Sequence, residues 1–440
     1  MIPSAAKRCT VMGLGRFGGG LGVTRWLLDQ GYTVCVTDLS GSDELTDSLA
    51  PLSDDIEAGR VRLQLGSHEL SDFTDTDLVI ANPAVPQPWD NSWLQAASNQ
   101  GVPISTEIRL LVEQLDRSRV IGVTGTNGKS TTTAMIHHIL IRCGLDARLG
   151  GNIGGSLLST INDVTPNTWF VLELSSAMLY WLGDEHGDQG WSPGTAVITN
   201  IAPNHIDWHG SEAHYRQCKE NITRWQTDED MVLRGESVAR STPIPIRLPG
   251  AHNQANAHLA VMVVSKATDI TPAQAATALS DFPGLPHRLE PVGTDGRFFN
   301  DSKSTTPEAT VLAVQAFAPK CSRVHLIAGG YDKGVSLDAI AALSTEIGGL
   351  YTIGTTGPNL AEQATGQVVS CGDLETAVNK AFQNMGPGDI LLLSPGCASW
   401  DQFEHFEARG EAFRSLVSAH SGTMGSDRIA PTNSLSEPTP

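Results

Sequence analysis

Long apolar runs and paired cysteines are both absent from this 440-residue sequence. No apolar stretch approaches the ~20 residues that a membrane-spanning helix needs. The N-terminus, MIPSAAKRCTVMGLG, leads into a strand-like segment and not into a signal peptide. The seven cysteines are scattered singly, with neither a C-x-x-C pair nor zinc-like spacing. We therefore expect reduced thiols in a cytoplasmic protein that does not associate with membranes.

Positive charge is scarce as well. Lys and Arg number 29 against 48 Asp and Glu, so the formal net charge is −19. This balance argues against a diffuse basic surface for nucleic acid or anionic membranes, so any phosphate must be held locally. Hydrophobic residues at 40% and charged residues at 18% indicate a folded globular chain. At ~150 residues per domain, the length suggests about three domains.

Short apolar runs, each followed by a helix-like stretch, recur along the chain. This alternation is typical of parallel sheets covered by helices on both faces. A break near residue 105 and the Pro- and Gly-rich segment DFPGLPHRLEPVG predict domains at 1–105, 106–284 and 285–418. Residues 419–440 are rich in Ser, Thr, Pro and Gly, which predicts a disordered tail.

The segment VIGVTGTNGKSTTTAMIHHIL has the pattern of a strand, a glycine-containing turn and a helix. Backbone amides of Gly125 to Lys129 are predicted to wrap a triphosphate at the helix N-terminus. Lys129 then reaches the β- and γ-phosphates, and the Ser130 hydroxyl binds Mg²⁺. Val123 stands where the generic pattern G-x-x-x-x-G-K-[ST] has its first glycine. The alternative is a turn that caps an ordinary helix, but the strand before it and the helix after it favour ATP binding.

Near the N-terminus, Gly13, Gly15 and Gly18 follow a predicted strand in G-x-G-x-x-G spacing. Asp38 ends the next predicted strand, 20 residues after the last of these glycines. This is the dinucleotide-binding fingerprint in its usual context. An NAD-dependent oxidoreductase is therefore one hypothesis for the function.

Two further predicted strands end in polar residues. WFVLELSS places Glu173 at the C-terminal end of one strand, and TAVITNIAPNHIDWHG places His205 and Asp207 just beyond another. Parallel sheets bind their ligands at this edge. Together with Ser130, a carboxylate and an imidazole can complete the shell of a Mg²⁺ ion. Considered singly, Glu173 is equally well explained as a helix-capping acid and His205 as an ordinary loop histidine.

The octapeptide TGTNGKST resembles the nucleotide loop of the Mur ligases, the ATP-dependent amide ligases of peptidoglycan precursor synthesis, which share it with folylpolyglutamate synthetases. Later landmarks of that family follow in order, so the resemblance covers residues 8–418. It implies an α/β fold of three domains. These are a Rossmann-like N-terminal domain for a UDP-linked substrate, a central P-loop ATPase-type parallel sheet for ATP, and a Rossmann-like C-terminal domain for an amino acid.

The resemblance also implies roles for single residues. Glu173 in E-L-S-S binds Mg²⁺, and His205 in N-H-I-D serves a second Mg²⁺. Lys219 in HYRQCKENI is carbamylated by CO₂ and becomes an anionic metal ligand, whereas without the family it is an ordinary solvated helix lysine. The implied metal ligands are Ser130, Glu173, His205 and Lys219. The implied ATP-binding residues are Gly125, Thr126, Asn127, Gly128, Lys129, Ser130, Thr131, Asn253, Asn256, Arg288 and Asp301.

The segment FFNDSKSTTPEATVLAVQAF predicts a strand, a polar loop and a helix with Thr306 as N-cap and Pro307 at its first position. In the Mur ligases the matching N-D-S-K-[AS]-T motif puts Asp301 near ATP, and Lys303 and Thr305 near the substrates. The segment LSPGCASWDQFEHFEARG resembles the terminal signature of the members that add D-glutamate. The implied D-glutamate contacts are Lys303, Thr305, Lys333, Ser399 and Phe406.

The resemblance gives the N-terminal glycines a role other than NAD binding, near the diphosphate of UDP-N-acetylmuramoyl-L-alanine. The implied contacts with this substrate are Gly13, Leu14, Gly15, Asp38, Asn82, Asn152, Ser175 and His205. Several positions depart from the family: Leu-Ser at 39–40 replaces a polar or basic pair, Asn82 and Ala84 replace Ser and Gly, and Met178 replaces Gln. The segment 219–248 is much shorter than in the family, and we expect it to lack the customary N-x-D-D strand. These changes affect sugar recognition and not phosphoryl transfer.

The implied reaction is phosphorylation of the L-alanyl carboxylate by ATP, followed by attack of the D-glutamate amine on the acyl phosphate. Because this chemistry needs a dry site, we expect the C-terminal domain to close over ATP. We expect a monomer that uses ATP, two Mg²⁺ ions and small-molecule substrates, without a nucleic-acid partner. The alternatives are another Mur-type or folylpolyglutamate-type ligase, an NAD-dependent oxidoreductase, and a non-catalytic nucleotide-sugar binder. The predicted catalytic residues are Lys129, Glu173, His205, Lys219, Asp301 and Lys303.

Overall fold

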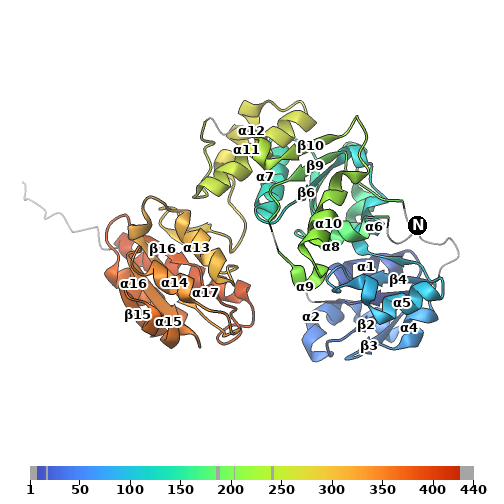
Figure 1. Cartoon of the computed structure of the whole chain (residues 1–440), viewed down its shortest axis with the longest axis horizontal. Helices are drawn as coiled ribbons and strands as arrows, with labels where there is room; N and C mark the ends of the chain where they lie inside the picture. The colour runs from blue at the N-terminus through green and yellow to red at the C-terminus, as the bar shows by residue number, and fades with distance from the viewer. Residues whose placement is uncertain (1–6, 16–17, 185–188, 203, 239–241, 427–440) are drawn as a thin grey trace, which may run out of the picture. The chain divides into compact units, whose positions relative to one another are not determined.

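The structure, a computed structural model, describes residues 7–15, 18–184, 189–202, 204–238 and 242–426 (Figure 1). Three β-sheets organise the chain. The contacts among its residues divide it into two compact units. Unit 1 comprises Met1–Pro245 and Ala255–Ser280, and unit 2 comprises Ile246–Gln254 and Asp281–Pro440.

The first sheet of unit 1 is parallel throughout, with the strand order β3-β2-β1-β4-β5. Strand β1 buries every residue after Arg8, and β4 is apolar and buried throughout, as expected for strands covered on both faces. The strands are β1 Arg8–Met12, β2 Thr33–Asp38, β3 Val61–Leu65, β4 Leu78–Ala81 and β5 Ile104–Ser105. The accompanying helices are α1 Gly19–Asp29, α2 Thr46–Leu49, α3 Ser53–Glu57, α4 Leu70–Thr74 and α5 Ser92–Asn99.

The second sheet of unit 1 is also parallel, with the order β10-β9-β6-β8-β7. Its strands are β6 Val120–Thr124, β7 Ala147–Gly151, β8 Trp169–Glu173, β9 Thr195–Ile198 and β10 Met231–Arg234. The helices around it are α6 Glu107–Val112, α7 Lys129–Arg142, α8 Ser176–Trp181, α9 Ile206–His209, α10 Glu212–Arg224, α11 Ala251–Ala267 and α12 Pro272–Ala278. The customary strand expected to be missing from residues 219–248 is present as β10, which pairs with β9 at the sheet edge, although the segment carries no N-x-D-D sequence.

The two sheets of unit 1 share one hydrophobic cluster, which includes Val11 and Leu27 from the first and Val120 and Leu172 from the second. Helix α1 also packs closely on the segment after β7, since a Cβ atom at Gly22 would lie 2.4 Å from that of Ser156. The first two predicted domains therefore form one compact unit. The boundary expected at residue 105 falls between β5 and α6, and a division into three domains stays a prediction.

Unit 2 contains the third sheet, with the order β11-β12-β16-β13-β14-β15, parallel except for β11. Its strands are β11 Glu290–Val292, β12 Phe298–Asn300, β13 Val324–Gly329, β14 Gly349–Ile353, β15 Val368–Gly372 and β16 Ile390–Leu393. The helices are α13 Pro307–Gln315, α14 Asp338–Leu343, α15 Gly357–Gln363, α16 Leu374–Asn384 and α17 Phe406–Ser426. The α/β fold with three sheet regions is confirmed, and no helix within the described ranges is long and apolar enough to cross a membrane.

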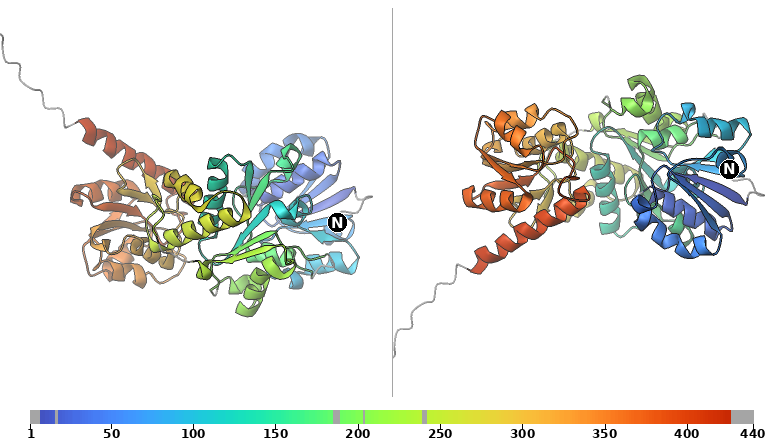
Figure 2. Two further views of the ribbon diagram at one scale, coloured as in Figure 1. Left: turned by 90° about the horizontal axis from the view of Figure 1, so that it is seen from above. Right: turned by 90° about the horizontal axis from the view of Figure 1, so that it is seen from below.

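Helix α17 corrects the predicted start of the disordered tail. It continues without interruption to Ser426, so residues 419–426 are helical (Figure 2). The physical reason is an anchor on α16, where the His420 ring stacks on Phe382 at 4.3 Å and its Nε2 lies 2.7 Å from Asn379 Oδ1. Residues 427–440, the rest of that prediction, lie outside the described residues.

Candidate nucleotide and substrate site

The glycine-containing turn lies between β6 and α7, as predicted. Val123 is part of β6, is fully buried, and accepts a hydrogen bond from the Leu174 amide at 2.8 Å, so the loop itself begins after it. Gly125 has φ +147°, and a Cβ atom there would lie 1.9 Å from Thr199 Oγ1. Only glycine fits this position, whereas a first glycine at 123 is not needed inside a buried strand.

Two backbone amides of this loop already donate hydrogen bonds to Asn200. The Thr126 amide donates to the Asn200 carbonyl at 2.8 Å, and the Asn127 amide donates to the Asn200 side-chain oxygen at 3.1 Å. The Lys129 ammonium folds back onto the Thr126 carbonyl at 2.9 Å. The segment after β9 therefore already satisfies the amides of Thr126 and Asn127, and the binding of phosphate by the Gly125–Lys129 amides stays a prediction.

Gly128 ends the loop in a left-handed conformation, with φ +80°, at the N-cap of α7. A Cβ atom there would lie 2.6 Å from Asn256 Oδ1, so α11 presents this amide directly to the loop. Asn253, one turn earlier on α11, is buried and donates from Nδ2 to the Pro249 carbonyl at 2.7 Å. The structure thus brings Asn256 to the nucleotide loop, whereas Asn253 binds its own helix N-terminus.

Replacing Gly128 by alanine is expected to weaken ATP binding about tenfold or more, since left-handed strain of ~1–2 kcal/mol adds to the collision with Asn256. Titration calorimetry with ATP measures this change. Gly144→Ala is the matched control, because Gly144 has φ +85° but no atom within 4 Å of an added Cβ. Equal ATP affinities for the two variants would show that the close approach of Asn256 has no bearing on nucleotide binding.

Glu173 ends β8 and is almost wholly buried. Its Oε1 atom accepts a hydrogen bond from Asn152 Nδ2 at 2.9 Å. Its Oε2 atom is also buried and has no hydrogen-bond partner among the described residues. A buried carboxylate oxygen without a partner is costly, and a divalent cation is a ligand that would satisfy it. This unsatisfied oxygen makes Glu173 fit the predicted metal role.

Lys219 is not a solvated surface residue. It lies on α10 with only 2% of its area exposed, and its Nζ donates to the Gly125 carbonyl at 2.7 Å. Burial, followed by repulsion from Lys129, lowers the pKa of Lys219 from 10.5 to about 7. A substantial fraction of this amine is therefore neutral near pH 7.

His205 precedes α9 in a left-handed conformation, with φ +50°. Although the residue is largely exposed, desolvation of its ring and the positive charge of Lys129 lower its pKa. The imidazole is therefore mainly neutral near pH 7, the form that binds a metal ion.

A cavity of about 730 Å³ in unit 1 gathers many of the predicted residues, and we call it the glycine-loop cavity. It lies where the first and second sheets meet, and Met178, one of the departures from the family pattern, also lines it. Ser130 and Glu173 are not among its lining residues; both are buried beside the β6–α7 turn and at the end of β8. The predicted residues that line it are Gly13, Leu14, Gly15, Asn82, Lys129, Asn152, Ser175, His205 and Lys219.

Two predicted substrate contacts instead hold the N-terminal glycine loop. Asp38 accepts hydrogen bonds from the amides of Gly15 at 3.1 Å and Ser40 at 2.9 Å. Asn82 donates from Nδ2 to the Gly13 carbonyl at 3.2 Å and accepts from the Ala84 amide at 2.9 Å. The Asn82 amide therefore joins the glycine loop, through its Nδ2, to the turn that contains Ala84, through its oxygen.

In unit 2, Asp301 follows β12 and is buried under three hydrogen bonds, from the hydroxyls of Ser304 and Ser394 and the amide of Leu289. Burial nevertheless raises the pKa of Asp301 to about 6. The Lys303 ammonium lies 5.1 Å from the centre of the Phe406 ring. Asp301 thus holds the loop from which Lys303 projects.

The remaining predicted residues of unit 2 lie on neighbouring loops. Lys333 has its ammonium 5.1 Å from the Trp400 ring centre, and Ser399 is buried. Arg288 is exposed on the segment before β11. Thr305 lies in the loop before α13, where Thr306 and Pro307 begin the helix as predicted.

Sequence reasoning missed Arg409, which is 1% exposed on α17. Its guanidinium donates to Ser302 Oγ and to the carbonyls of Ser302, Cys397 and Ala398, at 2.9–3.1 Å. It therefore ties the loop that carries Lys303 to the loop that follows β16. The arginine of the terminal A-R-G sequence was the available signal, but charge alone does not predict burial.

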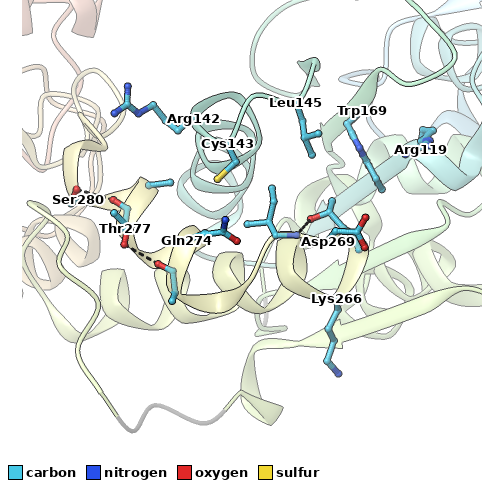
Figure 3. Close-up of a pocket in the computed structure, with 15 residues that line it drawn as sticks. Arg119, Arg142, Cys143, Leu145, Trp169, Lys266, Asp269, Gln274, Thr277 and Ser280 are labelled. Atoms are coloured by element: carbon cyan, nitrogen blue, oxygen red, sulfur yellow. Dashed lines mark hydrogen bonds between the residues drawn. The ribbon is translucent and has the colours of Figure 1, made fainter.

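A larger cavity of about 970 Å³ lies elsewhere in unit 1, where Arg119, Arg142, Trp169 and Lys266 surround the ends of α7 and α11 (Figure 3). None of its described lining residues is a predicted site residue. The cavity that gathers the predicted residues is therefore not the larger of these two cavities.

Comparison with known proteins identifies the family. Three family profiles match successive parts of the chain: "Mur ligase MurD-like, N-terminal domain" at residues 7–106, "Mur ligase middle domain" at 123–239, and "Mur ligase, glutamate ligase domain" at 287–397. Together with the nucleotide loop and the strand-end residues, these matches show that the chain belongs to the Mur ligase family.

Within the family, the chain resembles one particular group of curated relatives, each named UDP-N-acetylmuramoylalanine--D-glutamate ligase. The relative from Roseiflexus sp. is 35% identical, across 94% of this chain and 98% of its own. That from Acidobacterium capsulatum is 32% identical, across 94% and 97%. The relative from Streptococcus mutans is 33% identical, across 92% and 96%.

Solved structures support the fold. The ligase MurC of Thermotoga maritima matches with a TM-score of 0.56 and 19% identity, across 95% of this chain and 100% of its own. MurF of Acinetobacter baumannii matches with a TM-score of 0.51 and 17% identity, across 94% and 95%. At these identities the likeness shows the α/β fold alone.

Proposed function

We propose that this chain is an ATP-dependent ligase that joins D-glutamate to UDP-N-acetylmuramoyl-L-alanine in peptidoglycan precursor synthesis. The observation that carries the proposal is the glycine-loop cavity, where the glycine loop of the first sheet meets Lys129, His205 and Lys219 of the second. The full-length similarity to D-glutamate-adding relatives supports the choice of substrates. An NAD-dependent oxidoreductase would leave Lys129, His205 and Lys219 without a role.

The residues present suit two Mg²⁺ ions. Ser130 and Glu173 would hold one ion, and His205 and a modified Lys219 would hold the other; the unsatisfied Oε2 of Glu173 is the structural support. Bound Mg²⁺ neutralises charge on phosphate oxygens. Its proposed ligands come from the ends of β8 and β9 and from α7 and α10.

Lys219 is proposed to react with CO₂ to form a carbamate. The ammonium first loses one proton to solvent. The neutral amine then attacks CO₂, an N–C bond forms, and a second proton leaves to solvent, so that a cationic side chain becomes an anionic one. Burial and a pKa of about 7 supply the neutral amine. The present hydrogen bond to the Gly125 carbonyl would be kept by the carbamate N–H.

In the proposed reaction, the L-alanyl carboxylate accepts the γ-phosphoryl group and ADP leaves. The amine of D-glutamate then attacks the acyl carbon, the C–O bond to phosphate breaks, and the amine loses a proton. Lys129 balances charge on the transferring group. We propose that ATP is contacted by Arg288 and Asn256. The proposed contacts of D-glutamate are Lys303, Thr305, Lys333, Ser399 and Phe406. Asp301 positions Lys303 through its buried hydrogen bonds. Amide formation is thereby coupled to ATP.

We also propose that the enzyme works in the cytoplasm as a monomer, which light scattering on the purified chain would test. All seven cysteines are free thiols in the structure, as a reducing compartment requires.

The substrates are tested by incubating the chain with UDP-N-acetylmuramoyl-L-alanine, ATP, Mg²⁺ and one amino acid at a time. We expect a product heavier by one glutamate minus water, with one phosphate released per product, for D-glutamate only. L-glutamate, L-lysine and meso-diaminopimelate are the matched alternatives, and an NAD titration tests the oxidoreductase hypothesis. A product with another amino acid would reassign the substrate, and absence of any ATP consumption would remove the ligase assignment.

A further inference from the structure

Three potential metal ligands that the proposed reaction does not use lie together in unit 1: His209, His214 and Cys218. One candidate donor atom from each lies within 4.8 Å of those of the other two. Within the described ranges, they form the one group of three or more His, Cys, Asp or Glu side chains that meets this criterion. We call these residues the His-His-Cys cluster.

Local structure explains why these three side chains meet. His209 is the last residue of α9, and Gly210, with φ +71°, turns the chain into α10. The Ser211 hydroxyl caps α10 by accepting from the His214 amide at 3.2 Å. His214 and Cys218 are four residues apart on α10, so they lie on the same helix face. The turn returns His209 to that face, beside His214.

Hydrogen bonds within the cluster and to Ser176 fix which ring nitrogen of each imidazole carries its proton. His214 Nδ1 lies 3.2 Å from both the carbonyl and the Nδ1 atom of His209. Because the carbonyl only accepts, His214 Nδ1 carries the proton and its Nε2 keeps the lone pair. That Nε2 lies 3.5 Å from Cys218 Sγ. His209 Nε2 lies 2.9 Å from Ser176 Oγ, and donation to this hydroxyl leaves Nδ1 as the donor atom. Metal-binding histidines are oriented in this way by carbonyls and hydroxyls around them.

We propose that the His-His-Cys cluster is a binding site for a borderline divalent transition-metal ion of the Zn²⁺ type. Two imidazoles and one thiolate suit such an ion, whereas Mg²⁺ requires oxygen ligands, so this site is chemically distinct from the proposed Mg²⁺ positions. Tetrahedral Zn²⁺ holds N and S ligands about 3.3–3.6 Å apart. The 3.5 Å between His214 Nε2 and Cys218 Sγ already has this spacing.

A fourth ligand and an entry path are available. His209 and His214 line a cavity of about 580 Å³ together with Trp89 and Tyr180, and a water molecule can complete the tetrahedron from this side. On metal binding the Cys218 thiol releases its proton to solvent as the sulfur–metal bond forms. Because the metal would join the end of α9 to α10, it would also stabilise unit 1 against unfolding.

The test uses Co²⁺ as a spectroscopic stand-in for Zn²⁺ on the full chain, with excess Mg²⁺ to occupy oxygen-rich sites. We expect one equivalent of Co²⁺ to produce a sulfur-to-cobalt charge-transfer band and intense visible bands of tetrahedral coordination, both removed when Zn²⁺ is added. Zn²⁺ is also expected to raise the unfolding temperature. These readouts do not depend on ligase activity, so failure of the proposed function leaves them unaffected.

Variants identify the ligands. Cys218→Ser is expected to abolish the charge-transfer band, and His214→Gln, at a half-buried position, to reduce Co²⁺ affinity at least tenfold. Cys143→Ser is the matched control and retains the full spectrum, because Cys143 lies at the end of α7. Circular dichroism verifies that each variant is folded. A wild-type chain without the charge-transfer band, or a band that survives Cys218→Ser, would overturn the proposal.

Discussion

Replacing Lys129 by alanine is expected to lower ATP-dependent product formation by about 10³-fold, because Lys129 is the cation that balances charge on the transferring phosphoryl group. The folded chain should persist, because a charge-assisted hydrogen bond such as that from Lys129 to the Thr126 carbonyl contributes ~1.5–3 kcal/mol, less than the total stability of a typical domain. Initial rates of phosphate release measure the first effect, and thermal unfolding measures the second.

The matched control for Lys129→Ala is Lys266→Ala, which removes an exposed lysine of unit 1 at the larger cavity. This variant should keep the wild-type rate. Lys129→Ala has a second consequence that a merely structural lysine would not have. Because the charge of Lys129 depresses the pKa of Lys219, its removal should raise that pKa. Undiminished turnover by Lys129→Ala would exclude the nucleotide-loop assignment.

Lys219→Ala is expected to lower the rate by at least about 10²-fold through loss of an anionic metal ligand. Added bicarbonate should not restore activity, because the variant has no amine to modify. Added acetate should restore part of it by placing a carboxylate in the vacated space, whereas chloride at equal ionic strength should not. Rates with and without these anions measure the effect, and an unchanged rate would exclude the carbamate.

The same lysine predicts a pH dependence. Since burial lowers the pKa of Lys219 to about 7, the neutral amine that captures CO₂ becomes more abundant as pH rises through 7. At fixed dissolved CO₂, carbamate occupancy should therefore rise over this interval. Carbon NMR with labelled CO₂ measures the occupancy, and its signal should be missing in Lys219→Ala. Occupancy that falls as pH rises would contradict the lowered pKa.

Much of the candidate site could be predicted because its residues occupy fixed places relative to strands and helices. Glu173 ends β8, His205 follows β9, and Lys129 begins α7. In parallel sheets such positions converge at one edge. The alternation of apolar runs and helical segments predicted these elements before any contact was known.

Other features depend on contacts between segments that are distant in sequence. The amides of Thr126 and Asn127 donate hydrogen bonds to Asn200, and no local sequence pattern predicts this pairing. In the sequence, Lys219 cannot be distinguished from an ordinary helix lysine. Its burial arises because α10 packs against the nucleotide loop. The helix at residues 419–426 likewise depends on the contact between His420 and Phe382, not on its own composition.

The order of motifs alone determined the α/β class, the nucleotide loop and the family resemblance, because turn glycines and strand-end polar groups are local requirements of backbone geometry. Only the tertiary structure decided which of these groups are buried, which amides are already satisfied, and that His209, His214 and Cys218 meet. Burial changes the free energy of a charged group such as Lys219, and proximity brings metal ligands from different helices together. Both effects arise from packing between segments that are distant in the sequence.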